Sequence, residues 1–145
     1  MLKGIDPLLN GELLKILDEM GHGDQLLVVD RNFPAAATGR QVVRLGPVGV
    51  VEVIGAILTV FPLDSFVATP LERMEVDDDA SIVTGNQEAV LELARAEAGR
   101  QLEYGVIPRL DFYQRAKDVY AVVHTLEPQG YGCFILQKGV IFADA

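Results

Sequence analysis

The histidine at position 22 is the residue whose type and setting best suit proton transfer. The chain contains two histidines, and His22 lies between two glycines in the segment Met-Gly-His-Gly-Asp, just after a predicted helix. The carbonyl end of a helix is the negative end of its dipole, so it favours a protonated imidazole. A histidine held in its charged form can act as a general acid near neutral pH. The other interpretation of His22 is a surface side chain at the end of the helix.

A carboxylate stands at the far end of the next predicted strand. Asp30 follows the apolar run at positions 25–29, and α/β sheets usually bind ligands at the carboxyl ends of their strands. A carboxylate there can accept two ligand hydroxyls or orient a neighbouring histidine, and it can equally cap the following loop. Each strand residue adds about 3.3 Å. His22 and Asp30 would therefore share an end of the sheet only if the strand runs in the appropriate sense.

Three further side chains are weaker candidates for ligand binding. Arg109 follows Pro108 and could donate to hydroxyls or a carboxylate, although a single arginine is usually a solvated charge. Tyr120 begins an apolar segment, where core packing is the ordinary role of a tyrosine. Tyr131 lies in a Gly-Tyr-Gly turn and could stack on a ligand or contact a partner protein.

The remaining reactive residue types form no recognisable pattern. Asp77, Asp78 and Asp79 lack the alternating ligands and closing glutamate of a calcium loop, so a solvated turn is expected. Cys133 and His124 could be a nucleophile and its base, but a buried thiol is the ordinary outcome. The glycines fit neither a phosphate-binding loop nor a dinucleotide fingerprint, and no zinc spacing occurs. The sequence therefore predicts neither a metal nor a cofactor.

The composition indicates a small globular protein. The chain has 145 residues, of which 50% are hydrophobic, and this predicts a single domain over residues 1–145. A formal net charge of −9 argues against nucleic acid and anionic membrane surfaces as partners. The single cysteine cannot form an internal disulfide, and the first residues carry no apolar signal core. We expect a soluble, cytoplasmic protein.

The periodicity of the apolar residues predicts an α/β fold in which helices cover both faces of a sheet. A polar stretch at 31–40 is expected to be a functional loop. A turn-rich segment is expected to join the last two strands as neighbours. The first expected helix has its apolar stripe at 13–20, with Asn10 as its cap and Gly21 at its end. The other expected helices are 50–61, 86–98 and 112–118, the last capped by Asp111, and the expected strands are 25–29, 41–45, 66–75, 120–125 and 134–137.

Several of these segments together resemble a known family. The opening Met-Leu-Lys-Gly-Ile-Asp-Pro-Leu-Leu and the Met-Gly-His-Gly-Asp block resemble the RbsD/FucU sugar mutarotases. The resemblance continues through Val-Asp-Arg-Asn-Phe-Pro, Ile-Pro-Arg, Phe-Tyr-Gln-Arg-Ala-Lys and Tyr-Gly-Cys-Phe-Ile-Leu-Gln-Lys-Gly-Val, in the order of the family. It implies a three-layer α/β/α fold with a central mixed sheet. It also implies an enzyme that interconverts the α and β anomers of a pyranose such as L-fucose.

The resemblance also implies roles for individual residues. His22 falls on the family's catalytic proton donor, and Asp30 on a substrate-binding aspartate. Arg109 indicates the fucose-type branch, because ribose-type members tend to have a histidine there. A bound water or Tyr120 would accept the anomeric proton.

The C-terminal sugar-contacting segment of the family falls on Tyr131, Gly132 and Cys133. Cys133 replaces the family's asparagine, and a thiol cannot reproduce the donor and acceptor pair of an amide. This departure bears on the preferred sugar. Family members assemble as homo-oligomeric rings, commonly decamers, in which a neighbouring subunit completes the site.

Two alternatives to an L-fucose mutarotase stay open at this point. One is a D-ribose-type pyranase, and the other is a protein that binds a monosaccharide for sensing or transport without turning it over. Mutarotation itself needs a proton delivered to the ring oxygen and another removed from the anomeric hydroxyl. Positioned acid and base groups typically contribute about 10²–10⁴-fold to such steps.

Overall fold

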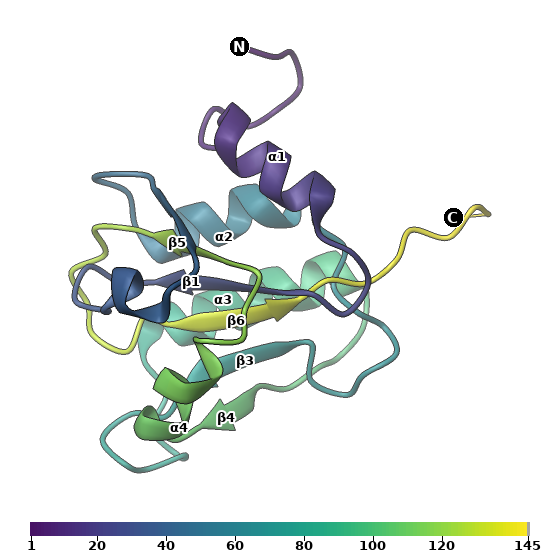
Figure 1. Ribbon diagram of the computed structural model, residues 1–145. Coiled ribbons are helices and arrows are strands. Elements are labelled where there is room, and N and C mark those ends of the chain that lie inside the picture. The colour runs from purple at the N-terminus through teal and green to yellow at the C-terminus, as the bar shows by residue number, and fades with distance from the viewer. Residues whose placement is uncertain (145) are drawn as a thin grey trace.

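A six-stranded mixed sheet forms the centre of the molecule (Figure 1). The computed structural model describes residues 1–144. The strands stand in the order β2-β5-β1-β6-β3-β4. Within these residues β6 alone runs antiparallel to its neighbours, and the other strands share one direction. The strand bounds are β1 Gln25–Val29, β2 Gln41–Arg44, β3 Leu71–Met74, β4 Gly105–Ile107, β5 Ala121–His124 and β6 Phe134–Gln137.

Local side-chain contacts fix where the helices begin. Asn10 caps α1, because its Oδ1 accepts a hydrogen bond from the backbone N–H of Leu13 at 2.9 Å. Thr84 and Gln87 form a reciprocal capping box at the start of α3. The helix bounds are α1 Gly11–Glu19, α2 Val50–Leu58, α3 Gly85–Ala98 and α4 Arg109–Arg115, with a short 3₁₀ helix η1 at Ala35–Thr38.

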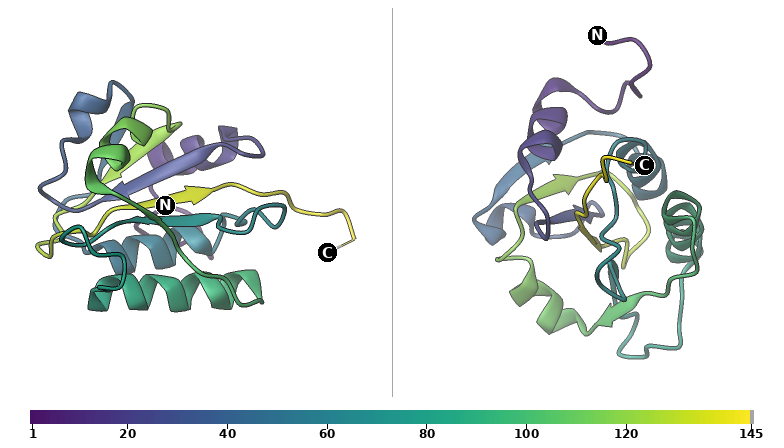
Figure 2. Two further views of the ribbon diagram at one scale, coloured as in Figure 1. Left: turned by 90° about the horizontal axis from the view of Figure 1, so that it is seen from below. Right: turned by 90° about the vertical axis from the view of Figure 1, so that its right-hand side faces the viewer.

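The helices lie on both faces of the sheet, so the predicted three-layer arrangement is confirmed. Figure 2 shows α2 and α3 along one face and η1 and α4 on the other. One apolar core joins the first face to α1, α2 and α3 and includes Leu13, Ile54 and Val90. A smaller core lies under η1 and α4 and includes Phe33 and Phe112. Burial of these side chains stabilises both layers by about 25 cal/mol per Å² of apolar surface.

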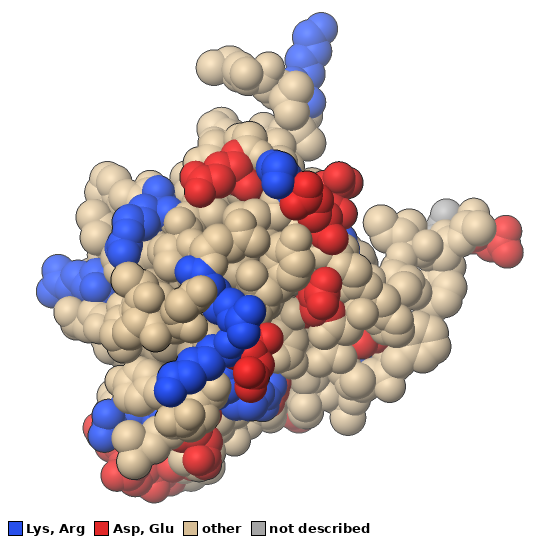
Figure 3. Space-filling view, viewed as in Figure 1, with Lys and Arg blue, Asp and Glu red and all other residues tan. Residues whose placement is uncertain are grey.

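The surface carries charges of both signs. Figure 3 shows basic and acidic side chains lying beside one another on the face that it presents. Arg115 and Glu72 form one such pair, with an N–O distance of 2.6 Å. None of the helices in residues 1–144 is long and apolar enough to cross a membrane.

The direction of the strands creates two distinct ends of the sheet. Asp30 follows β1, and the segment that leads into β6 meets it there; we call this end the Asp30 edge. At the opposite end, the N–H of Gly23 donates to the carbonyl of Lys138, just beyond β6, at 2.8 Å. His22 belongs to this second end, which we call the His22 edge.

Most of the predicted elements are present, and the differences have physical reasons. β1 and β6 have the predicted bounds. The prediction that the strands at 120–125 and 134–137 pair with each other was wrong, because β1 lies between them. The fourth helix begins at Arg109 rather than 112, since Pro108 takes the N-cap position and Asp111 lies inside the first turn. The sequence interpretation also missed β4 and η1, each of which has only three or four residues.

At the His22 edge, Gly139 lies close to the backbone of Leu63 and Asp64, and a substitution can test this contact. A Cβ atom on Gly139 would lie 2.7 Å from Asp64 Cα and 2.7 Å from the Leu63 carbonyl oxygen. We predict that Gly139→Ala lowers the free energy of unfolding by about 1–3 kcal/mol, because one of the two segments must move. Urea denaturation measures this change.

Gly11→Ala is the matched control, since a Cβ on Gly11 would meet no heavy atom within 4 Å. Equal stability of the Gly139→Ala and Gly11→Ala proteins would contradict the close approach.

Candidate active site

Asp30 organises the Asp30 edge through hydrogen bonds to two segments of the chain. The residue is only 4% exposed. Its Oδ1 accepts from the backbone N–H of Asn32 at 3.0 Å, and its Oδ2 accepts from the N–H of Gly132 at 3.0 Å. The thiol of Cys133 lies 3.5 Å from the same Oδ2 and donates to it. A carboxylate offers about four acceptor positions, so these three bonds leave capacity for one ligand hydroxyl.

The turn at 131–133 approaches Asp30 closely. Tyr131 has a left-handed backbone with φ of 59°, and its carbonyl accepts from Gln87 Nε2 at 3.2 Å. A Cβ on Gly132 would lie 3.4 Å from the Cβ of Asp30, so a larger residue there would crowd the carboxylate. Burial, together with the charge of Asp30, raises the pKa of the Cys133 thiol well above its usual value. Cys133 is therefore a neutral, buried donor, as the sequence predicted, and the arrangement gives no sign of a nucleophile paired with His124.

The hydroxyl of Tyr131 has a partner in the acidic turn at 77–79. It donates a hydrogen bond to Asp77 Oδ1 at 2.7 Å. This bond is the largest of the effects that raise the pKa of Tyr131. Asp79 accepts hydrogen bonds from Ser81, which closes the turn locally. Within residues 1–144 no three His, Cys, Asp or Glu side chains are grouped in a way that could hold a metal ion.

Arg109 brings a positive charge to the same edge. It is the first residue of α4 and is exposed, and its guanidinium carbon lies 5.7 Å from the centre of the Tyr113 ring. Among the described residues no acidic side chain forms an ion pair with Arg109. Its N–H donors are therefore available to a ligand, while the guanidinium lies over an aromatic ring.

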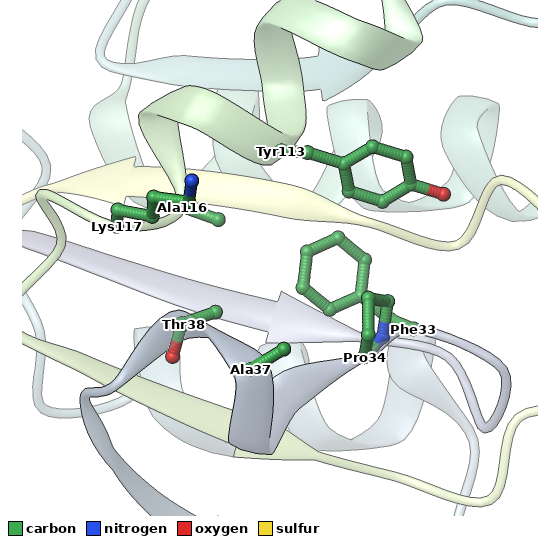
Figure 4. Close-up of a pocket in the computed structure, with 7 residues that line it drawn as sticks. All are labelled: Phe33, Pro34, Ala37, Thr38, Tyr113, Ala116 and Lys117. Carbon is green, nitrogen blue, oxygen red and sulfur yellow. The ribbon is translucent and has the colours of Figure 1, made fainter.

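A cavity of about 180 Å³ lies between these groups. This is smaller than the 300–1,000 Å³ typical of sites for drug-sized ligands, so it suits a small molecule. A second, mostly apolar cavity of about 80 Å³ adjoins it and shares Phe33 and Tyr113 (Figure 4). Figure 4 shows the Phe33 ring between Tyr113 of α4 and Ala37 of η1. The larger cavity is lined by Asp30, Asn32, Phe33, Met74, Arg109, Tyr113, Gly130, Tyr131 and Cys133.

His22 forms a different constellation at the opposite edge. Its side chain is 46% exposed, and its Nε2 lies 3.2 Å from both carboxylate oxygens of Asp64. The Phe66 ring packs against the imidazole at a centroid distance of 5.3 Å, and the Phe142 ring lies 6.1 Å beyond Phe66. With Nε2 directed at a carboxylate, Nδ1 is the ring nitrogen left for a ligand.

Asp64 is a buried carboxylate that stays ionised because other groups support its charge. Burial acts to raise its pKa, but hydrogen bonds from the Phe66 N–H, Gln137 and His22 outweigh burial and lower that pKa. The Phe66 N–H and Gln137 Nε2 lie 2.9 Å from its carboxylate oxygens. A buried carboxylate that faces an exposed imidazole can hold that ring in a fixed orientation.

The structure thus divides the residues that the sequence singled out into two groups. Asp30, Arg109 and the 131–133 turn gather around one cavity. His22 lies beyond the other end of β1, whose five residues span about 16 Å. Tyr120 also belongs to the His22 edge, because its N–H donates to the carbonyl of Gln25 at 2.8 Å. Within one chain, His22 and Asp30 do not share a pocket.

The sequence interpretation missed two carboxylates that contact candidate residues. Asp64 meets His22 across 42 positions of the chain, and no local pattern marks that contact. Asp77 was assigned to a solvated turn, and the turn exists, but its carboxylate also holds Tyr131. The Tyr131–Asp77 contact follows from the pairing of β3 with β6, and the His22–Asp64 contact from the bridge between Leu63 and Lys138. Only the tertiary structure specifies these pairings.

Known proteins are similar to this chain in sequence and fold. An L-fucose mutarotase from Actinobacillus pleuropneumoniae is 39% identical over 140 residues, covering 97% of each chain. The fucose mutarotase from Streptococcus pneumoniae, solved in complex with L-fucose, superposes with a TM-score of 0.89 at 33% identity, covering 97% of this chain and 100% of that one. The RbsD of Bacillus subtilis, solved with D-ribose, gives a TM-score of 0.74 at 25% identity, covering 98% and 100%.

The model of the RbsD / FucU transport protein family matches residues 3–141, which is nearly the whole chain. The resemblance that the sequence motifs suggested is therefore confirmed. This chain belongs to the RbsD/FucU family.

Proposed function

We propose that this protein is a mutarotase that interconverts the α and β anomers of L-fucose. The observation that carries the proposal is the cavity at the Asp30 edge, where a buried carboxylate faces an unpaired guanidinium. A neutral polyhydroxylated ring offers both donors to the carboxylate and acceptors to the guanidinium. A chain 39% identical to an L-fucose mutarotase, and similar in fold to one that binds L-fucose, supports this sugar over D-ribose. The lone cysteine accords with action in the reducing cytoplasm.

The proposed active site combines the Asp30 edge of one copy with the His22 edge of a second copy. The distance along β1 keeps the two groups apart in a single chain, whereas the chemistry needs both at one sugar. The exposed rings of Phe66 and Phe142 beside His22 would become buried at such a contact. A head-to-tail contact can close into a ring when it is repeated, and we propose that this chain forms such a ring, the assembly that the family resemblance implies.

His22 is the proposed general acid. Opening of the pyranose needs a proton on the ring oxygen while the anomeric hydroxyl loses one. The freed aldehyde then rotates, and closure on its other face reverses both transfers. Asp64 would hold the imidazole in place through the contacts at 3.2 Å. Tyr120, at the same edge, or a bound water would accept the anomeric proton.

The remaining residues are proposed to hold the sugar. Asp30 would accept a hydrogen bond from one hydroxyl, and Arg109 would donate to others. Tyr131, which lines the cavity, would contact the ring, and Gly132 would hold the Asp30 carboxylate towards it through its N–H. Cys133 presents a small neutral thiol at the wall of the cavity, so it would shape the choice of sugar by its size and weak polarity.

Saturation-transfer NMR tests the proposed activity directly. We predict that the native protein accelerates exchange between the α and β resonances of L-fucose, and that His22→Ala returns the rate to its spontaneous value, a loss of about 10²-fold or more. D-ribose should be exchanged less efficiently than L-fucose. Full-rate exchange by His22→Ala would rule out His22 as the acid, and spontaneous-rate exchange by the native protein would favour a binding protein.

A complementation experiment tests the shared site. Separate His22→Ala and Arg109→Ala proteins should both be impaired, since each removes one half of every site. Co-expressed in equal amounts, they should regain about a quarter of the native rate, because random assembly leaves that share of sites with both residues intact. Absence of any recovery in a mixed oligomer verified by mass spectrometry would contradict a site built from two copies.

The ionised state of Asp64 predicts a pH-dependent stability. The pKa of Asp64 in the folded chain lies below its ordinary value of 3.8. Asp64 therefore stabilises the fold above that pH, and the contribution is lost as the pH falls through the lowered pKa. We expect Asp64→Asn to unfold at lower urea concentration than the native protein at pH 7, with the difference shrinking as the pH falls below 3.8. A pH-independent difference would contradict this assignment.

A further inference from the structure

Asp77, in the acidic turn at 77–79, contacts Tyr131, a residue that lines the cavity. The Tyr131 hydroxyl donates its only proton to Asp77 Oδ1 at 2.7 Å. Hydrogen bonds to an ionised acceptor are shorter and stronger than neutral ones. The direction of the phenolic O–H is therefore set by a residue that lies outside the cavity itself.

The turn that carries Asp77 is anchored from the interior of the protein. Arg73 is a fully buried guanidinium, and its Nη2 donates to the carbonyl of Ala80 at 2.9 Å. A bridge between Val76 and Asp79 closes the base of the turn. Asp77 and Asp78 both have left-handed backbones, with φ of 49° and 57°, which a non-glycine residue adopts only when the surrounding structure demands it. Asp77 is thus held at a defined position relative to Tyr131.

The hydrogen bond from Tyr131 to Asp77 determines how the Tyr131 hydroxyl can bind a ligand. With its proton committed to Asp77, Tyr131 offers only oxygen lone pairs to a ligand. Arg109 can only donate, and Asp30 can only accept. Asp77 thus makes Tyr131 an acceptor at the cavity, alongside the acceptor Asp30 and the donor Arg109.

We propose that Asp77 is a positioning residue, which orients Tyr131 so that the phenolic oxygen accepts a hydrogen bond from a hydroxyl of the bound sugar. The proposal rests on the mutarotase function proposed above. Asp77 acts through Tyr131 and does not itself touch the sugar. Its effect falls on binding, because the hydroxyl that it recognises is present in both the closed sugar and the transition state.

Exchange kinetics with a concentration series of L-fucose test the proposal. Asp77→Ala and Tyr131→Phe should each raise KM about five- to tenfold with kcat nearly unchanged. The double variant should be no worse than either single one, because both changes remove the same interaction. Asp77→Asn, which retains a carbonyl oxygen as acceptor, should have an intermediate KM.

Asp78→Ala is the matched control, since Asp78 has the same left-handed backbone in the same turn. It should match Asp77→Ala in thermal unfolding midpoint yet keep the native KM. A native KM in Asp77→Ala, a raised KM in Asp78→Ala, or additive losses in the double variant would overturn the role of Asp77. Failure of the native protein to accelerate exchange would instead refute the proposed function, so the two failures are distinguishable.

Discussion

The pairing of β6 with β1 and β3 is the constraint on which both constellations depend. β6 runs antiparallel to both neighbours, so it begins at the Asp30 edge and ends at the His22 edge. Its leading segment brings Gly132 and Cys133 to the carboxylate of Asp30. Its trailing residue Gln137 donates to Asp64, and Lys138 accepts from Gly23 beside His22. One short strand therefore positions the residues of both edges, and a shift of its register would displace both at once.

Electrostatics explain why buried charges are tolerated in so small a protein. Asp30 and Asp64 are each surrounded by N–H donors, which replace the water that a carboxylate loses on burial. Arg73 has no acidic partner within hydrogen-bonding distance among the described residues. It donates to the carbonyls of Met74 and Ala80 and lies 5.6 Å from the Tyr104 ring, and burial lowers its pKa. Burial of this guanidinium costs free energy, but Arg73 thereby anchors the turn at 77–79, whose Asp77 carboxylate binds Tyr131.

Local sequence patterns predicted the helices and strands well. They could not predict those contacts of the site that join residues far apart in the sequence. The run 25–29 is apolar at nearly every position, which fits a central strand, and the structure has it with the same bounds. The motifs around Asp30, Arg109 and Tyr131 were recognisable because each is a short contiguous segment. The contact of His22 with Asp64 spans 42 positions, and that of Tyr131 with Asp77 spans 54, so no window of sequence contains either pair. The place of β1 between β5 and β6 was equally inaccessible, because strand order is a property of the whole sheet.

The separation of His22 from Asp30 by the length of β1 has a consequence for how activity would arise in the cell. Under the proposed assembly, a newly folded chain is complete as a structure and inert as a catalyst. Turnover then depends on the concentration of the protein itself, since dilution below the dissociation constant of the ring would dismantle the sites without unfolding a single chain. When more protein is synthesised, the catalytic rate would therefore rise more than in direct proportion to the amount of protein.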